Sequence, residues 1–368
     1  MTAPDVLIVG AGLIGCAIAR SLASDGLEVQ VVDRDPPGTR ASWAAAGMLA
    51  PLAEADEPGA FLDLLRESAR RFPALAEELR ESTGIDVAYR TEGTLLVSLS
   101  PLDESRLERR FLWQSAAGLP VARLSGAEAR ELEPGLTPRV TAALRFPDDR
   151  QVDNRLLTRA MAMGARNTGA SFRRGEVAGL LTRGGRAEGL VLRDGEVIPA
   201  ERVVVAAGSW SGRLEGLPRP LPVRPVHGQL IALAAKSAGI EHVVHAPGAY
   251  LVPRRDGRLI VGATSEDTGF RTEVTAAAVE RLQSAALATF PALAGAELLE
   301  TWSGLRPGTP DSLPILGEDP DVSGLFYATG HYRNGILLAP ITAEIIADGI
   351  LRREPRIDVA PFSITRFG

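Results

Sequence analysis

The chain has 368 residues, of which 45% are apolar and 23% charged, and its formal net charge is −6. This composition is typical of a globular protein long enough for two domains, and the negative charge gives no reason to expect a nucleic acid or an anionic membrane as partner. Cys16 is the only cysteine, which excludes an intrachain disulfide and a cysteine-rich metal site, and the four histidines do not stand at metal-motif spacings, so no metal is expected.

The first forty residues carry the pattern of a nucleotide-binding unit. Residues 6–9 predict a buried strand, residues 14–23 a helix and residues 29–32 a second strand. Three glycines stand between the first strand and the helix in the spacing Gly-x-Gly-x-x-Gly: Gly10, Gly12 and Gly15. In this setting the first glycine permits a tight turn, the second lets the backbone approach a pyrophosphate, and the third lets helix and strand pack closely.

Asp33 ends the second strand, roughly 20 residues after the glycines, where an acidic side chain can accept hydrogen bonds from a ribose. The N–H groups at the start of the helix would face the anion. The pattern therefore predicts a dinucleotide site, without separating NAD from FAD. Cys16 lies in the predicted helix and is expected to be a small buried residue.

The apolar run over residues 6–23 is not typical of a signal peptide or a membrane span. It contains three glycines and Arg20, and Asp5 rather than a basic residue precedes it. We therefore expect a cytoplasmic protein with no membrane partner.

The middle of the chain predicts further helices and strands. Residues 61–82 predict a helix with one solvated face, residues 93–100 a strand, and residues 201–212 a buried strand that runs into a Gly/Ser turn. Asp153 is expected to cap the N-terminus of another helix.

The pattern changes to strands and hairpin turns after residue 221, with the sequence RRDGR at residues 254–258 as a hairpin signal. Near the end, residues 324–330 predict a strand, and a long apolar helix is expected to begin at Gly335. We predict an α/β fold of two discontinuous domains: a nucleotide-binding domain of residues 1–80, 143–220 and 300–368, and a second, strand-rich domain of residues 81–142 and 221–299.

Two stretches raise questions that the residues alone leave open. Residues 40–51 are mostly small, which suits either the approach of backbone to a flat ring or a tight packing corner. Arg306 lies among Gly, Pro, Thr and Leu, with no acidic neighbour before Asp311. Its guanidinium could bind a substrate anion or pair with an acid from a distant part of the chain.

Taken together, these segments resemble the FAD-dependent D-amino acid oxidase and glycine oxidase family, most of all the glycine oxidases of thiamine biosynthesis. The resemblance extends over nearly the whole chain. It is carried by VLIVGAGLIGCAIA, AAAGMLAP, VVVAAGSWSG, PVRPVHGQL, YLVPRRDGRLIVGAT, WSGLRPGTPDSLPILG and GHYRNGILLAP. The last two segments are more specific to this group than the glycine pattern is.

The resemblance implies a Rossmann-like FAD-binding domain beside a substrate domain with a large antiparallel β-sheet, and FAD bound non-covalently between them. Asp33 would hold the ribose, Val177 would contact the adenine through its backbone, and Gly335 would begin a helix that stabilises reduced flavin. The implied cofactor residues are Gly10, Ala11, Gly12, Leu13, Ile14, Gly15, Asp33, Arg34, Ser42, Ala45, Ala46, Gly47, Met48, Val177, Ala207, Gly208, Trp210, Arg306, Gly330, His331, Arg333, Asn334, Gly335 and Ile336.

The same resemblance implies three active-site side chains. Arg306 would clamp the substrate carboxylate, and Tyr250 would help to hold the substrate unless it is only a half-buried strand aromatic. Arg333 would be a further active-site residue or would brace its loop. The implied reaction is oxidative deamination of glycine or neutral D-amino acids by dioxygen, giving a 2-oxo acid, ammonia and hydrogen peroxide.

Other readings of the chemistry stay open at this stage. The protein could pass electrons to an acceptor other than dioxygen, oxidise sarcosine and other N-methyl amino acids, or bind flavin without catalysis. The amino acid and dioxygen are the expected small-molecule partners, and a homo-oligomer is compatible with the sequence. Gly248 and Ser265 are smaller than the side chains at these positions in glycine oxidases, which predicts a wider pocket, and His227 stands where the family commonly has a basic residue.

Overall fold

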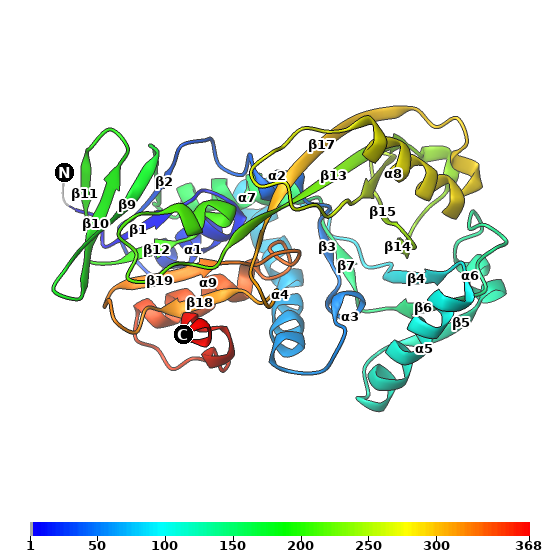
Figure 1. Ribbon diagram of the computed structural model, residues 1–368, viewed down its shortest axis with the longest axis horizontal. Helices are drawn as coiled ribbons and strands as arrows, with labels where there is room; N and C mark the ends of the chain where they lie inside the picture. Colours follow the sequence, from blue (N-terminus) through cyan, green and yellow to red (C-terminus); the bar gives the residue numbers. More distant parts are fainter. Residues whose placement is uncertain (1–2) are drawn as a thin grey trace.

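The computed structural model describes residues 3–368 and contains two large sheets, one at each end of the molecule (Figure 1). The first is a six-stranded sheet in the order β18-β19-β12-β1-β2-β8, with all neighbours parallel except β18 and β19. Its strands are β1 (Val6–Val9), β2 (Val29–Asp33), β8 (Ser171–Arg174), β12 (Val203–Val205), β18 (Ile315–Glu318) and β19 (Leu325–Thr329).

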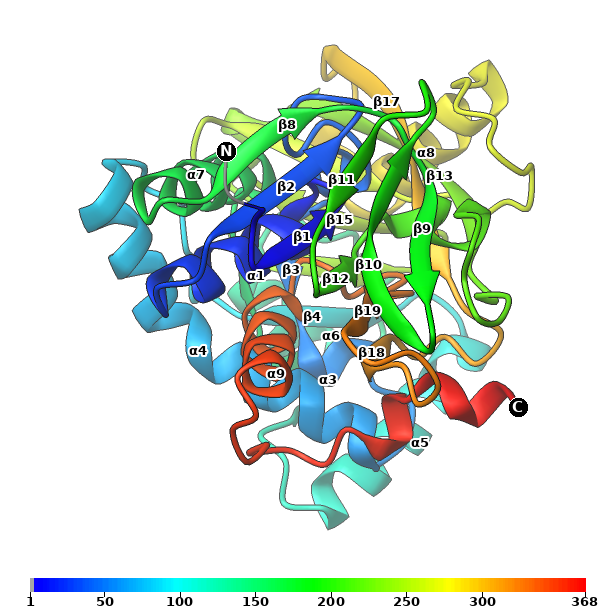
Figure 2. The same ribbon diagram turned by 90° about the vertical axis from the view of Figure 1, so that its left-hand side faces the viewer.

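Both faces of this sheet are covered, which explains why β1 is apolar at every position (Figure 2). Val6 and Ile8 pack against the helices of one face, whereas Leu7 and Val9 pack against a three-stranded sheet on the other. The helices are α1 (Leu13–Ser24), α4 (Ala60–Thr83), α7 (Asn154–Asn167) and α9 (Ala339–Ile350). The three-stranded sheet contains β9 (Val177–Arg183), β10 (Arg186–Leu192) and β11 (Val197–Pro199).

The second large sheet has eight strands in the order β17-β13-β16-β15-β14-β4-β6-β5, and only the β14–β4 pair is parallel. Its strands are β4 (Thr94–Ser98), β5 (Ala122–Ser125), β6 (Ala142–Phe146), β13 (Arg224–Ala234), β14 (Val243–Ala246), β15 (Ala249–Pro253), β16 (Arg258–Gly262) and β17 (Leu298–Gly308). The helices beside it are α5 (Pro101–Ala116), α6 (Gly126–Leu132) and α8 (Ala276–Thr289).

Short elements connect the two parts. They are α2 (Ala41–Ala44), α3 (Pro51–Glu54), and the small ladder of β3 (Met48–Leu49) with β7 (Arg150–Gln151). Short 3-10 helices are η1 (Gly208–Arg213), η2 (Lys236–Ala238), η3 (Pro291–Leu293), η4 (Ala360–Phe362) and η5 (Ile364–Phe367). None of the helices between residues 3 and 368 combines the length and the apolar character that a bilayer crossing requires.

Several local predictions are confirmed. The strand over residues 6–9 and the helix that follows it are present, and Asp153 caps α7 by accepting the N–H groups of Arg155 and Leu156. The predicted hairpin joins β15 and β16. The helix expected to begin at Gly335 is a correction: α9 begins at Ala339, and residues 335–338 form turns, with the Leu338 N–H donating to the Asn334 carbonyl at 2.8 Å.

The sheets also differ from two of the predicted domain limits. The limit at residue 300 cuts through β17, which pairs with β13 from Leu298 to Gly308, and the limit at residue 143 cuts through β6. Both strands belong to the eight-stranded sheet. The reason is physical: strand pairing is a long-range interaction, and a compositional change along the chain does not report it. The division into an FAD-binding and a substrate-binding domain stays our proposal.

Candidate active site

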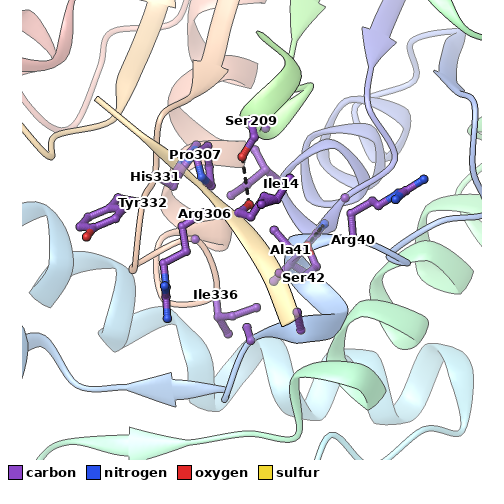
Figure 3. A pocket seen from close by; sticks show the side chains of 18 of the residues that line it. Ile14, Arg40, Ala41, Ser42, Ser209, Arg306, Pro307, His331, Tyr332 and Ile336 are labelled. Atoms are coloured by element: carbon purple, nitrogen blue, oxygen red, sulfur yellow. Dashed lines mark hydrogen bonds between the residues drawn. The ribbon is translucent and has the colours of Figure 1, made fainter. Parts of the chain in front are cut away.

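A cavity of about 590 Å³ runs between the six-stranded and eight-stranded sheets. One end is lined by the β1–α1 turn and the end of β2, and the other by strands β13 to β17. Figure 3 shows Arg306 among the lining side chains, together with Ile14, Ser42 and Ile336 from elsewhere in the chain. The volume lies within the range that small-molecule and cofactor sites occupy.

Each of the three glycines in the β1–α1 turn is required for a different structural reason. Gly10 has a φ of +108°, and a Cβ there would lie 2.4 Å from the Ala206 carbonyl oxygen. A Cβ at Gly15 would lie 1.9 Å from the Gly10 carbonyl oxygen. Packing therefore forbids a side chain at both positions. A Cβ at Gly12 would meet only the Ser42 Oγ, at 3.4 Å, and Gly12 lines the cavity. Gly12 thus leaves backbone open to a ligand.

The Asp33 carboxylate lies at this end and organises the turn. Its Oδ2 accepts the N–H of Ala11 at 2.7 Å, and its Oδ1 accepts the N–H of Asp35 at 2.9 Å. A carboxylate offers about four acceptor sites, so two remain for another donor. Ser42 Oγ accepts the N–H of Leu13 at 2.9 Å, which fixes α2 against the start of α1.

An aromatic stack closes one wall of the cavity near the same end. The guanidinium carbon of Arg34 lies 4.5 Å from the Trp210 ring centroid, and that of Arg40 lies 5.6 Å from it. Trp210 contacts Phe270, with ring centroids 5.4 Å apart. Phe270 lies between β16 and α8, so this stack joins the two halves of the molecule.

Most predicted cofactor residues line this cavity. They include Leu13, Ile14, Ala45, Ala46, Gly47, Met48, Val177, Ala207, Gly208, Trp210, His331, Arg333, Gly335 and Ile336. Four predicted residues are absent from the lining: Ala11, Gly15, Gly330 and Asn334. Gly330 has a φ of +74°, and a Cβ there would lie 2.6 Å from the Thr309 side chain, so it shapes the turn after β19.

The eight-stranded sheet presents Tyr250 to the other end of the cavity. Gly262, Tyr250 and His245 occupy neighbouring strands as directly paired residues, so they share one face of the sheet. A Cβ at Gly262 would lie 2.6 Å from the ring carbons and the hydroxyl of Tyr250. The Tyr250 ring therefore lies across a position where only glycine fits. Burial raises the pKa of Tyr250, and the charge of Arg306 opposes that rise.

Arg306 lies over a second such glycine. A Cβ at Gly228 would lie 2.2 Å from Nη1 of Arg306. Nη1 donates to the Thr264 carbonyl at 3.1 Å. Between residues 3 and 368, no carboxylate lies within ion-pair distance of this guanidinium. Most of its donors therefore remain available to a ligand in the cavity.

Arg333, by contrast, has a protein partner. Its Nη2 lies 3.1 Å from Oε1 of Glu54, whose side chain is 12% exposed. The Glu54 charge is the main reason that the pKa of Arg333 is raised. Sequence reasoning missed Glu54. It is the last residue of α3, three residues after the stretch of small residues over 40–51, and it lines the cavity.

Two histidines line the cavity at this end. His331 bonds through Nε2 to the Thr342 hydroxyl at 2.9 Å, and burial lowers its pKa to about 3. His245 was not singled out from the sequence, and burial lowers its pKa to about 4. His227 is buried and does not line the cavity; its Nδ1 lies 3.5 Å from Glu266. Among residues 3–368, no group of three or more side chains is arranged to hold a metal ion.

The structure gives a backbone reason for the glycine at residue 248. This residue lies in the turn between β14 and β15 with a φ of +88°, a conformation that favours glycine. A Cβ there would contact the Ala285 Cβ at 3.8 Å. Its small size therefore has a backbone cause, and the prediction of a wider pocket now depends on Ser265, which is exposed and lines the cavity.

Comparison with known proteins gives a consistent result over nearly the full length. A glycine oxidase from Geobacillus kaustophilus is 39% identical over 366 residues, which cover 98% of this chain and 97% of that protein. The crystal structure of glycine oxidase from Geobacillus kaustophilus has a TM-score of 0.95 and covers 99% of both chains at 38% identity. A bifunctional protein ThiO/ThiG from Synechocystis is 41% identical, and this chain spans 54% of its length.

The family model described as FAD dependent oxidoreductase matches residues 5–349. The match takes in both large sheets and every side chain described above, from the glycine turn to Arg333. The chain therefore belongs to the FAD-dependent oxidoreductase family of D-amino acid oxidase type.

Proposed function

We propose that this protein is an amino acid oxidase that deaminates glycine and neutral D-amino acids. Glycine, water and dioxygen would give glyoxylate, ammonia and hydrogen peroxide. The observation that carries the proposal is Arg306, a guanidinium without a carboxylate partner among the described residues, beside the partly buried Tyr250 in a cavity that begins at the dinucleotide turn. The similarity to glycine oxidases supports the choice of glycine.

The residues at the end of the cavity that is lined by the β1–α1 turn fit FAD. Gly10 and Gly15 permit a turn that no other residue allows, Gly12 leaves backbone open, and Asp33 retains acceptor sites. We infer that these residues hold the adenosine and pyrophosphate, and that residues 45–48 and 331–336 lie against the flavin ring. When bound, FAD supplies the two-electron acceptor of the reaction.

Arg306 and Tyr250 would position the amino acid. A planar guanidinium matches a carboxylate with two parallel hydrogen bonds, which fixes direction as well as place. The raised pKa keeps the Tyr250 phenol protonated at neutral pH, so its hydroxyl can donate to the same carboxylate. Catalysis would then consist mainly of orientation. No side chain is needed to take a proton from carbon.

We infer that Arg333 braces the loop after β19 and is not a second carboxylate clamp. Its charge is already compensated by Glu54 at 3.1 Å, and its side chain is 49% exposed. The ion pair joins residues 331–336 to α3, and residues of both segments line the cavity.

The test is a substrate panel with purified protein. Glycine should bleach the flavin absorbance without oxygen and, in air, should give oxygen uptake with one hydrogen peroxide per glyoxylate. Bleaching without oxygen uptake would indicate a different electron acceptor, and faster bleaching by sarcosine an N-methyl amino acid oxidase. A flavin that no amino acid bleaches would refute the proposal.

The half-length match to bifunctional ThiO/ThiG proteins supports a role in thiamine biosynthesis. A cytoplasmic location and homo-oligomerisation stay predictions.

A further inference from the structure

His245 lies in the proposed substrate site and has no role in the steps above. It belongs to β14 and pairs directly with Tyr250 of β15, with ring centroids 6.1 Å apart. Both side chains line the cavity. Because directly paired residues of antiparallel strands project from the same face, the imidazole lies on the face that carries the proposed carboxylate clamp.

The imidazole of His245 has an unused hydrogen-bonding atom. Within the described residues, its Nε2 is buried and has no hydrogen-bond partner. Two of the other three histidines are bonded: His331 to Thr342 at 2.9 Å, and His242 to Glu133 at 2.8 Å. His227 also lacks a hydrogen bond, but it lies outside the cavity. A buried polar atom without a partner is uncommon and is often found where a ligand supplies the partner.

The surroundings keep His245 uncharged. Burial lowers its pKa to about 4, and the nearby charges of Glu54 and of Arg333 act in opposite directions. At neutral pH the ring therefore has one N–H donor and one acceptor nitrogen. It is too weak a base to take a proton from a substrate ammonium group. The charge of Arg110 also lowers the pKa of His245. Both arginines already have carboxylate partners, Glu54 for Arg333 and Asp56 for Arg110, so this end of the cavity suits an uncharged polar group better than a further charge.

The spacing of the strands indicates the length of that group. The Tyr250 hydroxyl lies over Gly262 on β16, and His245 is on β14, two strands away. Two strand spacings amount to about 10 Å between the backbones. An amino acid whose carboxylate meets the Tyr250 hydroxyl, and whose side chain ends in a hydroxyl or carboxamide, covers a distance of this order when the hydrogen bonds at its two ends are included. Glycine leaves that space unfilled.

We propose that His245 is a specificity-determining residue that hydrogen-bonds an uncharged polar side chain, a hydroxyl or carboxamide, on a D-amino acid whose carboxylate is held by Arg306. The proposal depends on the amino acid oxidase function above. A site that hydrogen-bonds a substrate group discriminates strongly against an isostere that lacks the group, whereas an apolar pocket discriminates weakly. His245 therefore predicts a preference between molecules of equal shape.

The experiment compares two isosteric pairs with the FAD-loaded protein: D-asparagine against D-leucine, and D-serine against D-2-aminobutyrate. For the unaltered protein, kcat/KM should be higher for D-asparagine than for D-leucine. In His245→Phe the polar-to-apolar ratio should fall by about tenfold or more, and in His245→Asn part of the ratio should be kept. The control is His242→Asn, because His242 directly precedes β14, lies outside the cavity and should leave the ratio as it was when it is replaced.

A ratio cancels any general loss of activity, and the flavin absorbance of each variant shows whether it is folded and loaded. An unchanged ratio in loaded His245→Phe would overturn the proposal. If the unaltered protein favours the apolar members, or oxidises glycine alone, the proposal is wrong while the oxidase function stands. If no amino acid reduces its flavin, the function itself fails.

Discussion

Replacing Arg306 on β17 by leucine removes the proposed carboxylate clamp and leaves a shorter, apolar side chain in its place. In the unaltered protein the guanidinium lies over Gly228 and donates to the Thr264 carbonyl. Within residues 3–368 no carboxylate forms an ion pair with it, so the substrate would be its charged partner. Removing one member of a desolvated charge pair costs about 3–5 kcal/mol, which corresponds to a loss of between roughly two and four orders of magnitude in kcat/KM. Arg306→Lys should also be poor, because an ammonium group cannot form two parallel hydrogen bonds with a carboxylate.

The assay is anaerobic reduction of the flavin by glycine, followed by steady-state oxygen uptake. FAD should stay bound in Arg306→Leu, because the glycine turn and Asp33 lie at the other end of the cavity. A matched control is Arg224→Leu on the partner strand β13, where the arginine is 63% exposed and pairs with Asp267 outside the cavity. Near-normal kcat/KM in FAD-saturated Arg306→Leu would refute the clamp.

Three further outcomes are expected. FAD should be released into the supernatant on acid precipitation, since Cys16, the only cysteine, is buried in α1; flavin that stays with the pellet would show a covalent link. Activity should rise from pH 6 towards pH 9 as the substrate amine loses its proton. The cavity histidines are neutral throughout that range, because their pKa values are lowered to about 4 for His245 and about 3 for His331. A steady fall of kcat/KM over the same range with intact protein would contradict this prediction. Gly228→Ala and Gly262→Ala should each lower kcat/KM for glycine by tenfold or more, because the new Cβ would lie 2.2 Å from the Arg306 guanidinium or 2.6 Å from the Tyr250 hydroxyl and would displace it; flavin content tests whether such a variant is folded.

The sequence predicts the nucleotide-binding end of this protein well because its signals are local. The strand, the glycine turn and the helix follow one another within about twenty residues. The need for glycine at residue 15 is local, because a Cβ there would lie 1.9 Å from the Gly10 carbonyl oxygen of the same turn. The need at residue 10 is partly long-range, because a Cβ there would lie 2.4 Å from the carbonyl oxygen of Ala206. The spacing of the glycines nevertheless identifies the turn without knowledge of the rest of the fold.

The substrate end is predicted less completely because it is assembled by long-range pairing. Arg306 and Tyr250 were identified through the resemblance, whereas Glu54 and His245 reach the same cavity from α3 and β14. A local signal for His245 does exist in the segment HAPGAY. Its Pro-Gly pair is typical of a two-residue turn, and such a turn makes His245 the cross-strand partner of Tyr250.

The placing of Arg306 relative to the nucleotide site follows from β17, the strand that the predicted domain limit divided. The Nε1–H of Trp302 donates to the Ala44 carbonyl at 3.0 Å, and the Ser209 hydroxyl donates to the Leu305 carbonyl at 2.9 Å (Figure 3). Between these contacts, a Cβ at Gly304 would lie 2.5 Å from the Ala44 Cβ. The strand thus lies against α2 and η1 directly before it reaches Arg306.

These contacts come from the segments proposed to hold the flavin and the dinucleotide. β17 therefore ties the position of the guanidinium to α2 and η1, because its contacts with both lie within four residues of Arg306. This also explains why glycine stands at residue 304: a larger residue would separate β17 from α2 two positions before the arginine.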